Sequence, residues 1–148
     1  MNYNNNQRPK DKRGPELEIE AQKVFNDAVY QPCWITNEAN SDLPVFANKV
    51  GKEMAKTGLT SSKIRSIYGE IKRIQMNGFD NQKAYFYLLK PKVAYAFGRE
   101  NDNKGLALFK VIFDRASSEV KDAKTYNNFC NFMEAILAYH KYNVIKDK

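Results

Sequence analysis

The chain has 148 residues, of which 43% are hydrophobic and 13% are aromatic. This length allows one domain with a buried core, and the composition is too apolar for a disordered protein. The net charge of +7 and the pI near 9.3 favour an anionic partner, and the most common such partner of a basic protein is nucleic acid.

The cysteines and the apolar runs indicate a protein of the cytoplasm. Cys33 and Cys130 lack the spacing of metal ligands, and one pair makes no disulfide framework in a chain of this size. No apolar run approaches the roughly 18 residues of a membrane span, and the N-terminus lacks the apolar core of a signal peptide. We therefore expect a reduced, cytoplasmic protein that does not contact a membrane.

The residues of common catalytic sites are absent or badly spaced. His140 is the only histidine, and it follows Cys130 on one predicted helix at about 15 Å along the axis, so the two cannot form a nucleophile pair. The sequence has neither a glycine-rich phosphate loop nor a converging set of zinc ligands. We therefore expect no enzyme activity, no metal site and no cofactor.

The N-terminal residues differ from the rest of the chain. Residues 1–15 are rich in asparagine and cations, and we expect them to form a disordered basic arm. Residues 16–148 form the expected helical domain, of which residues 43–143 are the best-defined part.

The first part of this domain is acidic, because carboxylates outnumber cations between residues 15 and 42. Residues 16–30 predict a helix, since apolar residues recur loosely at helical spacing and glutamates near the start suit the helix dipole. Residues 31–41 predict a connector, and we expect Trp34 to anchor it onto the body of the domain.

Two consecutive amphipathic helices are predicted over residues 43–57 and 60–77, with a turn at Gly58 between them. Each has apolar residues at helical spacing on one face and cations on the opposite face. These cations are Lys49, Lys52 and Lys56 on the first helix and Lys63, Arg65, Lys72 and Arg73 on the second. They form either one continuous basic surface or two ordinary solvated faces, and the sequence leaves both alternatives open.

Residues 80–98 are apolar on almost every side. A helix of this kind is either central and buried or packs against a partner chain. Pro91 lies inside it, so we expect a kink or a break at that point. Lys90 and Lys92 flank the proline, and Arg99 lies on the same helix face as Lys92.

Two further helices are predicted over residues 105–121 and 125–143, again from apolar residues at helical spacing. No segment alternates polar and apolar residues with the period of a strand. The sequence therefore predicts an all-α fold, a compact single-domain bundle of five to six helices with a disordered N-terminal arm.

Three sequence blocks resemble the small-subunit family of the type III-A CRISPR effector, the Csm complex. Residues 60–71 (TSSKIRSIYGEI) are similar to the first block of that family, residues 88–99 (LLKPKVAYAFGR) to the second and residues 132–141 (FMEAILAYHK) to the C-terminal block. The order and spacing of the blocks agree over residues 43–142, which makes the resemblance more specific than any single block. Residues 1–40 show no such resemblance.

The resemblance implies a small helical protein without catalytic activity of its own. Several copies would stack into the inner filament of a complex that contains guide RNA, beside the backbone subunits and in contact with the large polymerase-like subunit at one end. The implied partners are guide RNA, target RNA, those subunits and copies of the chain itself.

Contacts to a nucleic-acid backbone of any sequence need cations rather than base-reading groups, so the resemblance makes the exposed cations the predicted RNA-binding residues. Arg65, Lys90, Lys92 and Arg99 follow from the family-like blocks, and Lys49, Lys52 and Lys56 follow from the helical projection alone. Lys63, Lys72 and Arg73 complete the predicted set.

Two other functions stay open from the sequence. The helices predicted over residues 43–57 and 60–77 match a helix-turn-helix superficially, which would indicate a DNA-binding regulator. However, Arg65 and Lys72 lack Asn or Gln companions that read bases, and a helical hairpin within a bundle has the same pattern. A helical enzyme that uses Glu134 is the other alternative.

Overall fold

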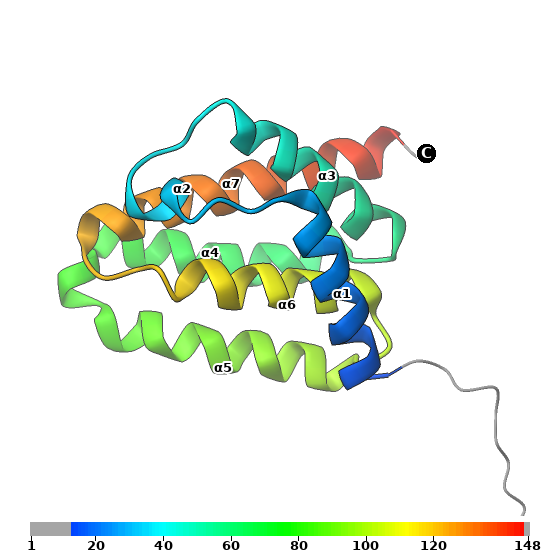
Figure 1. Cartoon of the computed structure of the whole chain (residues 1–148). Helices are drawn as coiled ribbons and strands as arrows, with labels where there is room; N and C mark the ends of the chain where they lie inside the picture. Colours follow the sequence, from blue (N-terminus) through cyan, green and yellow to red (C-terminus); the bar gives the residue numbers. More distant parts are fainter. Residues whose placement is uncertain (1–12, 147–148) are drawn as a thin grey trace, which may run out of the picture.

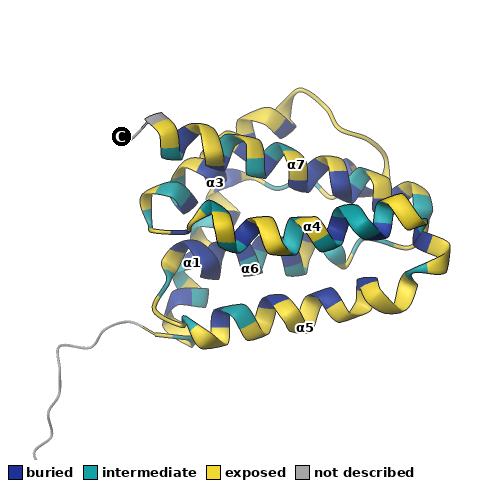
Figure 2. Cartoon of the chain, turned by 180° about the vertical axis from the view of Figure 1, so that it is seen from behind, coloured by how far each residue is buried: buried dark blue, intermediate teal, exposed yellow. Residues whose placement is uncertain are grey.

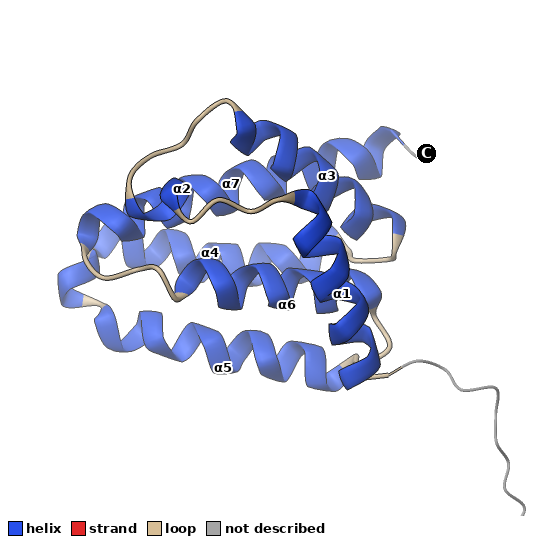
Figure 3. Ribbon diagram, in the orientation of Figure 1, coloured by secondary structure: helices blue, strands red, loops and turns tan. Residues whose placement is uncertain are grey.

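The computed structural model describes residues 13–146, and this part of the chain folds into helices without any strand (Figure 3). The predicted all-α class is confirmed. Residues 1–12 of the predicted N-terminal arm lie outside the described residues, whereas Pro15 already opens the first helix, a position that proline favours. The helices are α1 (Pro15–Ala28), α2 (Cys33–Thr36), α3 (Asp42–Lys56), α4 (Ser61–Asn77), α5 (Lys83–Arg99), α6 (Lys104–Ser117) and α7 (Ala123–Lys146), with a 3₁₀ turn, η1 (Phe79–Asn81), between α4 and α5.

The described residues contain seven α-helices rather than five to six, because the predicted connector includes the single turn α2. Trp34 holds this turn in place, as predicted. Its indole Nε1–H donates a hydrogen bond of 2.7 Å to the Asn40 side chain, and its ring lies 5.1 Å from the ring of Phe46. The Trp34 side chain is 1% exposed, so the turn is fixed by a large buried aromatic group.

The central helix of the bundle is α7, which contacts α2, α3, α4 and η1. Figure 1 shows α3 crossing α7 on one side, while α5 lies at the opposite edge of the bundle. The crossing is close because α3 has Gly51 there. A Cβ atom at Gly51 would lie only 2.7 Å from the backbone nitrogen of His140 and 2.8 Å from the carbonyl carbon of Tyr139.

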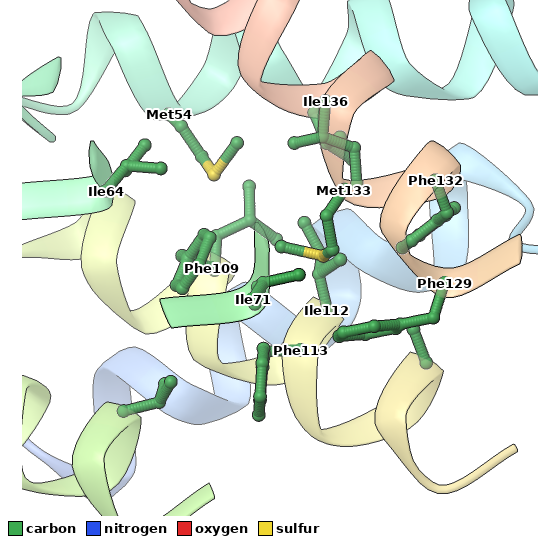
Figure 4. Close-up of a cluster of buried hydrophobic side chains, with 14 of the residues drawn as sticks. Met54, Ile64, Ile71, Phe109, Ile112, Phe113, Phe129, Phe132, Met133 and Ile136 are labelled. Atoms are coloured by element: carbon green, nitrogen blue, oxygen red, sulfur yellow. The ribbon is translucent and has the colours of Figure 1, made fainter. Parts of the chain in front are cut away.

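The core lies where α3, α4, α6 and α7 meet, and its side chains are almost completely shielded from solvent (Figure 4). Full burial of each large apolar side chain stabilises the fold by about 1.5–3 kcal/mol relative to an exposed position. The amphipathic stripes that the sequence predicts therefore face one common interior. Labelled members of this core are Met54, Ile64, Ile71, Phe109, Ile112, Phe113, Phe129, Phe132, Met133 and Ile136.

Helix α5 lies at the edge of the bundle, so the alternative that it is central and buried is wrong (Figure 2). Its inner face packs against α4 and α6, while the residues on its other side are exposed. Of the kink or break predicted at Pro91, the break is wrong, because one helix runs from Lys83 to Arg99. Pro91 is exposed, and the carbonyl of Tyr87, which loses its usual N–H partner, is on the solvent side where water can hydrate it. The buried residues of α5 are Phe86, Leu89, Val93 and Phe97.

Two buried polar side chains connect the helices through backbone carbonyls. The hydroxyl of Tyr126 donates a hydrogen bond of 2.6 Å to the carbonyl of Ile71, which joins α7 to α4. The imidazole Nε2–H of His140 donates to the carbonyl of Leu59 at 2.7 Å, and the side chain is 1% exposed. Burial lowers the pKa of His140, and the Leu59 bond only partly opposes this effect. His140 is therefore a structural residue, as expected for a lone histidine.

Candidate nucleic-acid interface

The predicted cations of α3 lie on the surface. Lys49, Lys52 and Lys56 are all exposed, on the side of the helix opposite its buried residues. Within residues 13–146, none of the three forms an ion pair with a carboxylate. Lys56 borders a groove of about 260 Å³ between α1, α3 and α6 that also contains Glu53. The α3 lysines therefore keep their charge available to an external anion.

Arg65 of α4 lies beside a cation that the sequence analysis missed. It lines a groove of about 280 Å³ between α4 and α7 together with Lys141, which is exposed on α7. Tyr68 and Glu134 line the same groove. Glu134 and Lys141 are two helical turns apart on one face of α7, but this spacing does not indicate which helix that face meets, so the sequence has no signal that places Lys141 beside Arg65.

A second groove, of about 590 Å³, separates α4 from α5 and contains three of the predicted cations. Lys63 and Lys92 line it, but each is paired with a carboxylate: Lys63 with Glu100 and Lys92 with Glu70, the latter at 3.9 Å. Arg99 is the third cation of the groove. An incoming phosphate would therefore have to compete with carboxylates that already contact two of the three cations.

Glu70 is the centre of this charge network. It accepts a hydrogen bond of 2.9 Å from Arg73, and Lys92 adds a second positive charge nearby. The Arg73 hydrogen bond is the largest cause that holds the pKa of Glu70 below its usual range, with the charges of Lys92 and Arg73 acting in the same direction. Glu70 therefore stays ionised at neutral pH and offsets part of the charge of both cations.

The remaining predicted cations have other neighbours. The guanidinium of Arg99 lies 5.8 Å from the ring centre of Tyr95, which is a cation–π distance. Lys72 donates a hydrogen bond of 2.9 Å to Gln75 on its own helix. Lys90 is exposed and borders a groove of about 230 Å³ between α5 and the end of α6.

The cations of α3 and α4 do not form one continuous surface, because the two helices pack on opposite sides of α7. The side that bears Glu134 and Lys141 meets α4, while α3 meets the side that bears Tyr139 and Asn143. The outward residues of α7 between these sides include Tyr142, which is uncharged. This packing also differs from a helix-turn-helix, in which the two helices pack chiefly on each other.

Neither a metal site nor a membrane span is found in the part of the chain that the structure describes. No group of three or more His, Cys, Asp or Glu side chains there could hold a metal ion. No helix between residues 13 and 146 is both long enough and apolar enough to cross a membrane.

Comparison with known proteins identifies the family. The family model described as Csm2 Type III-A matches residues 37–145, which is more than half of the chain. The chain belongs to the Csm2 family. A curated relative from Streptococcus thermophilus, "CRISPR system Cms protein Csm2", is 34% identical over 96 residues, which cover 60% of this chain and 76% of the relative. No solved structure matches the chain.

Membership of the Csm2 family makes this chain a structural subunit of a type III-A CRISPR complex, whose other subunits are its partners. The match begins after α2 has ended and reaches almost to the end of α7. It therefore includes every predicted cation as well as Lys141, whereas α1 lies outside it. The resemblance over residues 43–142 is confirmed.

Proposed function

We propose that this Csm2-family subunit binds the phosphate backbone of RNA inside the type III-A complex and has no catalytic activity. The single observation behind this proposal is that the α3 lysines and the Arg65–Lys141 pair are exposed cations without a carboxylate ion pair among the described residues. Guide RNA and target RNA are the proposed ligands. Copies of the chain would stack beside the backbone subunits as the inner filament, in the cytoplasm.

The chemistry of these side chains suits a backbone rather than a base sequence. Lysine and arginine bind phosphate oxygens at any sequence, whereas base recognition requires groups aimed at base edges. A complex that finds its target through guide pairing needs only sequence-independent contacts from its protein filament. The family-like block with Arg65 and the stripe of Lys49, Lys52 and Lys56 supply contacts of that kind.

Cys130 and His140 of α7 are both held inside the fold, which supports a role without catalysis. Burial raises the pKa of the Cys130 thiol to about 11, so this group stays protonated and poorly reactive near neutral pH. The Nε2–H of His140 already binds the carbonyl of Leu59. Glu134 is exposed in the groove beside Lys141, and His140, which also lines this groove, is buried with its Nε2–H bound to the carbonyl of Leu59.

The proposal is tested by the salt dependence of RNA binding. One variant removes the α3 charges (Lys49→Gln, Lys52→Gln and Lys56→Gln), and a second removes the groove charges (Arg65→Gln and Lys141→Gln). Each lost phosphate contact should reduce the slope of log affinity against log salt by about 0.7 for single-stranded RNA. We therefore expect a reduction of about 2 for the first variant and about 1.4 for the second.

The matched control neutralises Lys121, which precedes α7, and Lys124 in its first turn; both are exposed and belong to neither cation set. This control has the same loss of charge as the groove variant, and its slope should change by less than half as much. Equal slopes for wild type, the α3 variant and the groove variant would exclude RNA contact by these residues. Tight binding of one duplex DNA site in preference to single-stranded RNA would instead favour a DNA-binding regulator.

A further inference from the structure

The outer face of α5 is apolar although it faces solvent. Uncharged residues recur there at i, i+3, i+4 and i+7, the pattern of a helix face that packs on another helix. The large side chains on this face are well exposed: Tyr87 is 65%, Leu88 52% and Tyr95 68% exposed. We define the outer stripe of α5 as Ala84, Tyr87, Leu88, Pro91, Ala94, Tyr95 and Gly98.

Cations border the outer stripe on both sides. Lys83 and Lys90 lie along one margin, while Lys92 and Arg99 lie along the other, and all four are exposed. The stripe itself contains no charged residue. Helix α5 is therefore amphipathic twice, with one apolar face in the bundle and a second one outside it, which explains why the sequence alone predicts a helix apolar on almost every side.

Gly98 and Pro91 of the outer stripe are both exposed, and the packing of this chain does not require the glycine. A Cβ atom at Gly98 would meet nothing within 4 Å, so no close contact among the described residues requires glycine there. Glycine and proline within a helix both weaken it, yet Gly98 and Pro91 lie in the last three turns of α5. Together with Ala84 and Ala94 they give the stripe a low profile that allows another helix to approach closely.

The occupant is not a second α5, because an antiparallel pair of these helices would place Lys90 and Lys92 of each copy against the cations of the other. No other surface among residues 13–146 has an exposed apolar stripe to meet it, since the large apolar residues elsewhere are exposed singly or as the pair Tyr142 and Ile145. RNA fits the margins, and the exposed tyrosines can stack on bases, but Leu88 and the small residues between the tyrosines have no group that binds phosphate or a base. An apolar helix with acidic borders fits both the stripe and the margins.

We propose that the outer stripe of α5 is a protein-docking surface that receives an amphipathic helix with carboxylates along its borders, supplied by a different subunit of the type III-A complex. The inference relies on membership of the complex and not on RNA binding by α3 and α4. Leu88 and the two tyrosines of the stripe form the buried centre of the contact. Lys83, Lys90 and Arg99 pair with the partner's carboxylates, while Lys92 remains paired with Glu70.

The first test replaces Leu88 by glutamate, which adds charge at the centre of the stripe and leaves the bundle core unchanged. The variant should enter the assembled complex at least about tenfold less well than wild type, the loss expected for a central interface residue. Ile19→Glu is the matched control, because Ile19 is 59% exposed on α1 and lies outside the stripe. Circular dichroism and the melting temperature of the isolated variants establish that both fold, and the salt slope of RNA binding should equal that of wild type.

A second variant separates docking from folding. Gly98→Gln should keep or raise the melting temperature of the isolated protein, since a side chain is better tolerated in a helix and meets nothing there. It should nevertheless reduce incorporation into the complex, because the partner helix could no longer approach. Normal incorporation of both Leu88→Glu and Gly98→Gln would overturn the proposal.

The occupant is identified by a photocrosslinking amino acid, p-benzoylphenylalanine, placed at Tyr95 in the purified complex. We expect a crosslink to a helical peptide with acidic flanks from another subunit, located by mass spectrometry. A crosslink to a second copy of this chain, to RNA, or to nothing would overturn the proposal. The same outcomes leave the RNA contacts of α3 and α4 unaffected, so the two hypotheses fail independently.

Discussion

Replacement of Gly51 by alanine tests the close crossing of α3 over α7. Two backbone atoms, the nitrogen of His140 and the carbonyl carbon of Tyr139, would lie 2.7 and 2.8 Å from the new Cβ atom. Neither atom can rotate away as a side chain would, so α3 and α7 must separate. Separation loosens the packing of the buried side chains on either side of Gly51, including Val50 and Met54.

The expected magnitude combines two effects of opposite sign. Alanine improves the intrinsic helix propensity of α3 by about 1 kcal/mol relative to glycine. Overpacking at a well-packed contact costs about 1–3 kcal/mol, and more where backbone has to move. We expect Gly51→Ala to lower the free energy of unfolding by about 1–2 kcal/mol, which corresponds to a fall in Tm of about 3–7 °C for a domain of this size.

Gly69→Ala is the control, because Gly69 lies within α4 and a Cβ atom there would meet nothing within 4 Å. This variant should raise the free energy of unfolding by about 0.5–1 kcal/mol through helix propensity alone. Urea unfolding followed by circular dichroism measures both variants against wild type. If Gly51→Ala stabilises the protein as much as Gly69→Ala, the α3–α7 crossing is not as close as described.

Three further predictions concern buried polar groups. His140→Gln should remove part of the acid sensitivity of the fold. Burial lowers the pKa of His140 in the folded protein, so the unfolded chain takes up the proton first as the pH falls below about 6.5. Wild type therefore loses stability relative to the variant, by at most about 1.4 kcal/mol per pH unit. Parallel urea titrations at pH 7.5 and 5.5 measure this difference, and an equal pH dependence of the two proteins would contradict it. Tyr126→Phe should cost about 0.5–1.5 kcal/mol in urea unfolding, because the hydrogen bond from the hydroxyl to the carbonyl of Ile71 is lost; a neutral effect would argue that water replaces the hydroxyl. A thiol reagent should label Cys33 rapidly in the native protein and Cys130 only in denaturant, since Cys33 is exposed and Cys130 is buried with a raised pKa; rapid modification of both thiols in native buffer would refute the described burial.

Helical periodicity was sufficient to predict the elements that carry the proposed RNA contacts. The predicted helices over residues 43–57 and 60–77 agree with α3 and α4 to within one residue at each end. This agreement arises because each helix has a single apolar face, so the 3.6-residue period leaves only one orientation towards the core. The exposure of Lys52 and Arg65 follows from the same periodicity.

The relative placement of the helices could not be predicted from periodicity. The turn around Gly58 sends α3 and α4 to opposite sides of α7, and nothing in the spacing of apolar residues specifies that direction. For the same reason the pairing of Lys63 with Glu100 was not visible, because the two residues lie far apart in the sequence. Glu70 and Arg73 differ, since their i, i+3 spacing on one helix already indicates a pair.

The sequence left two alternatives for α5, burial inside the bundle or packing on a partner chain. The first alternative is wrong, and it arose because the helix has two apolar faces. The amino-acid composition of a fully buried helix is the same as that of a helix with one buried apolar face and one exposed apolar face, so composition alone cannot separate the two. Only the three-dimensional packing shows that Phe86 and Val93 face inward while Tyr87 and Leu88 face solvent.

The position of α7 in the chain has a consequence for synthesis of the protein. The ribosome releases α1 to α6 before the helix on which α2, α3 and α4 pack. At about 5–20 residues per second, the 24 residues of α7 take about 1–5 s to emerge. During that interval Met54 and Ile64 of the nascent chain lack their main packing partner, so the native bundle can form only after translation has passed α7.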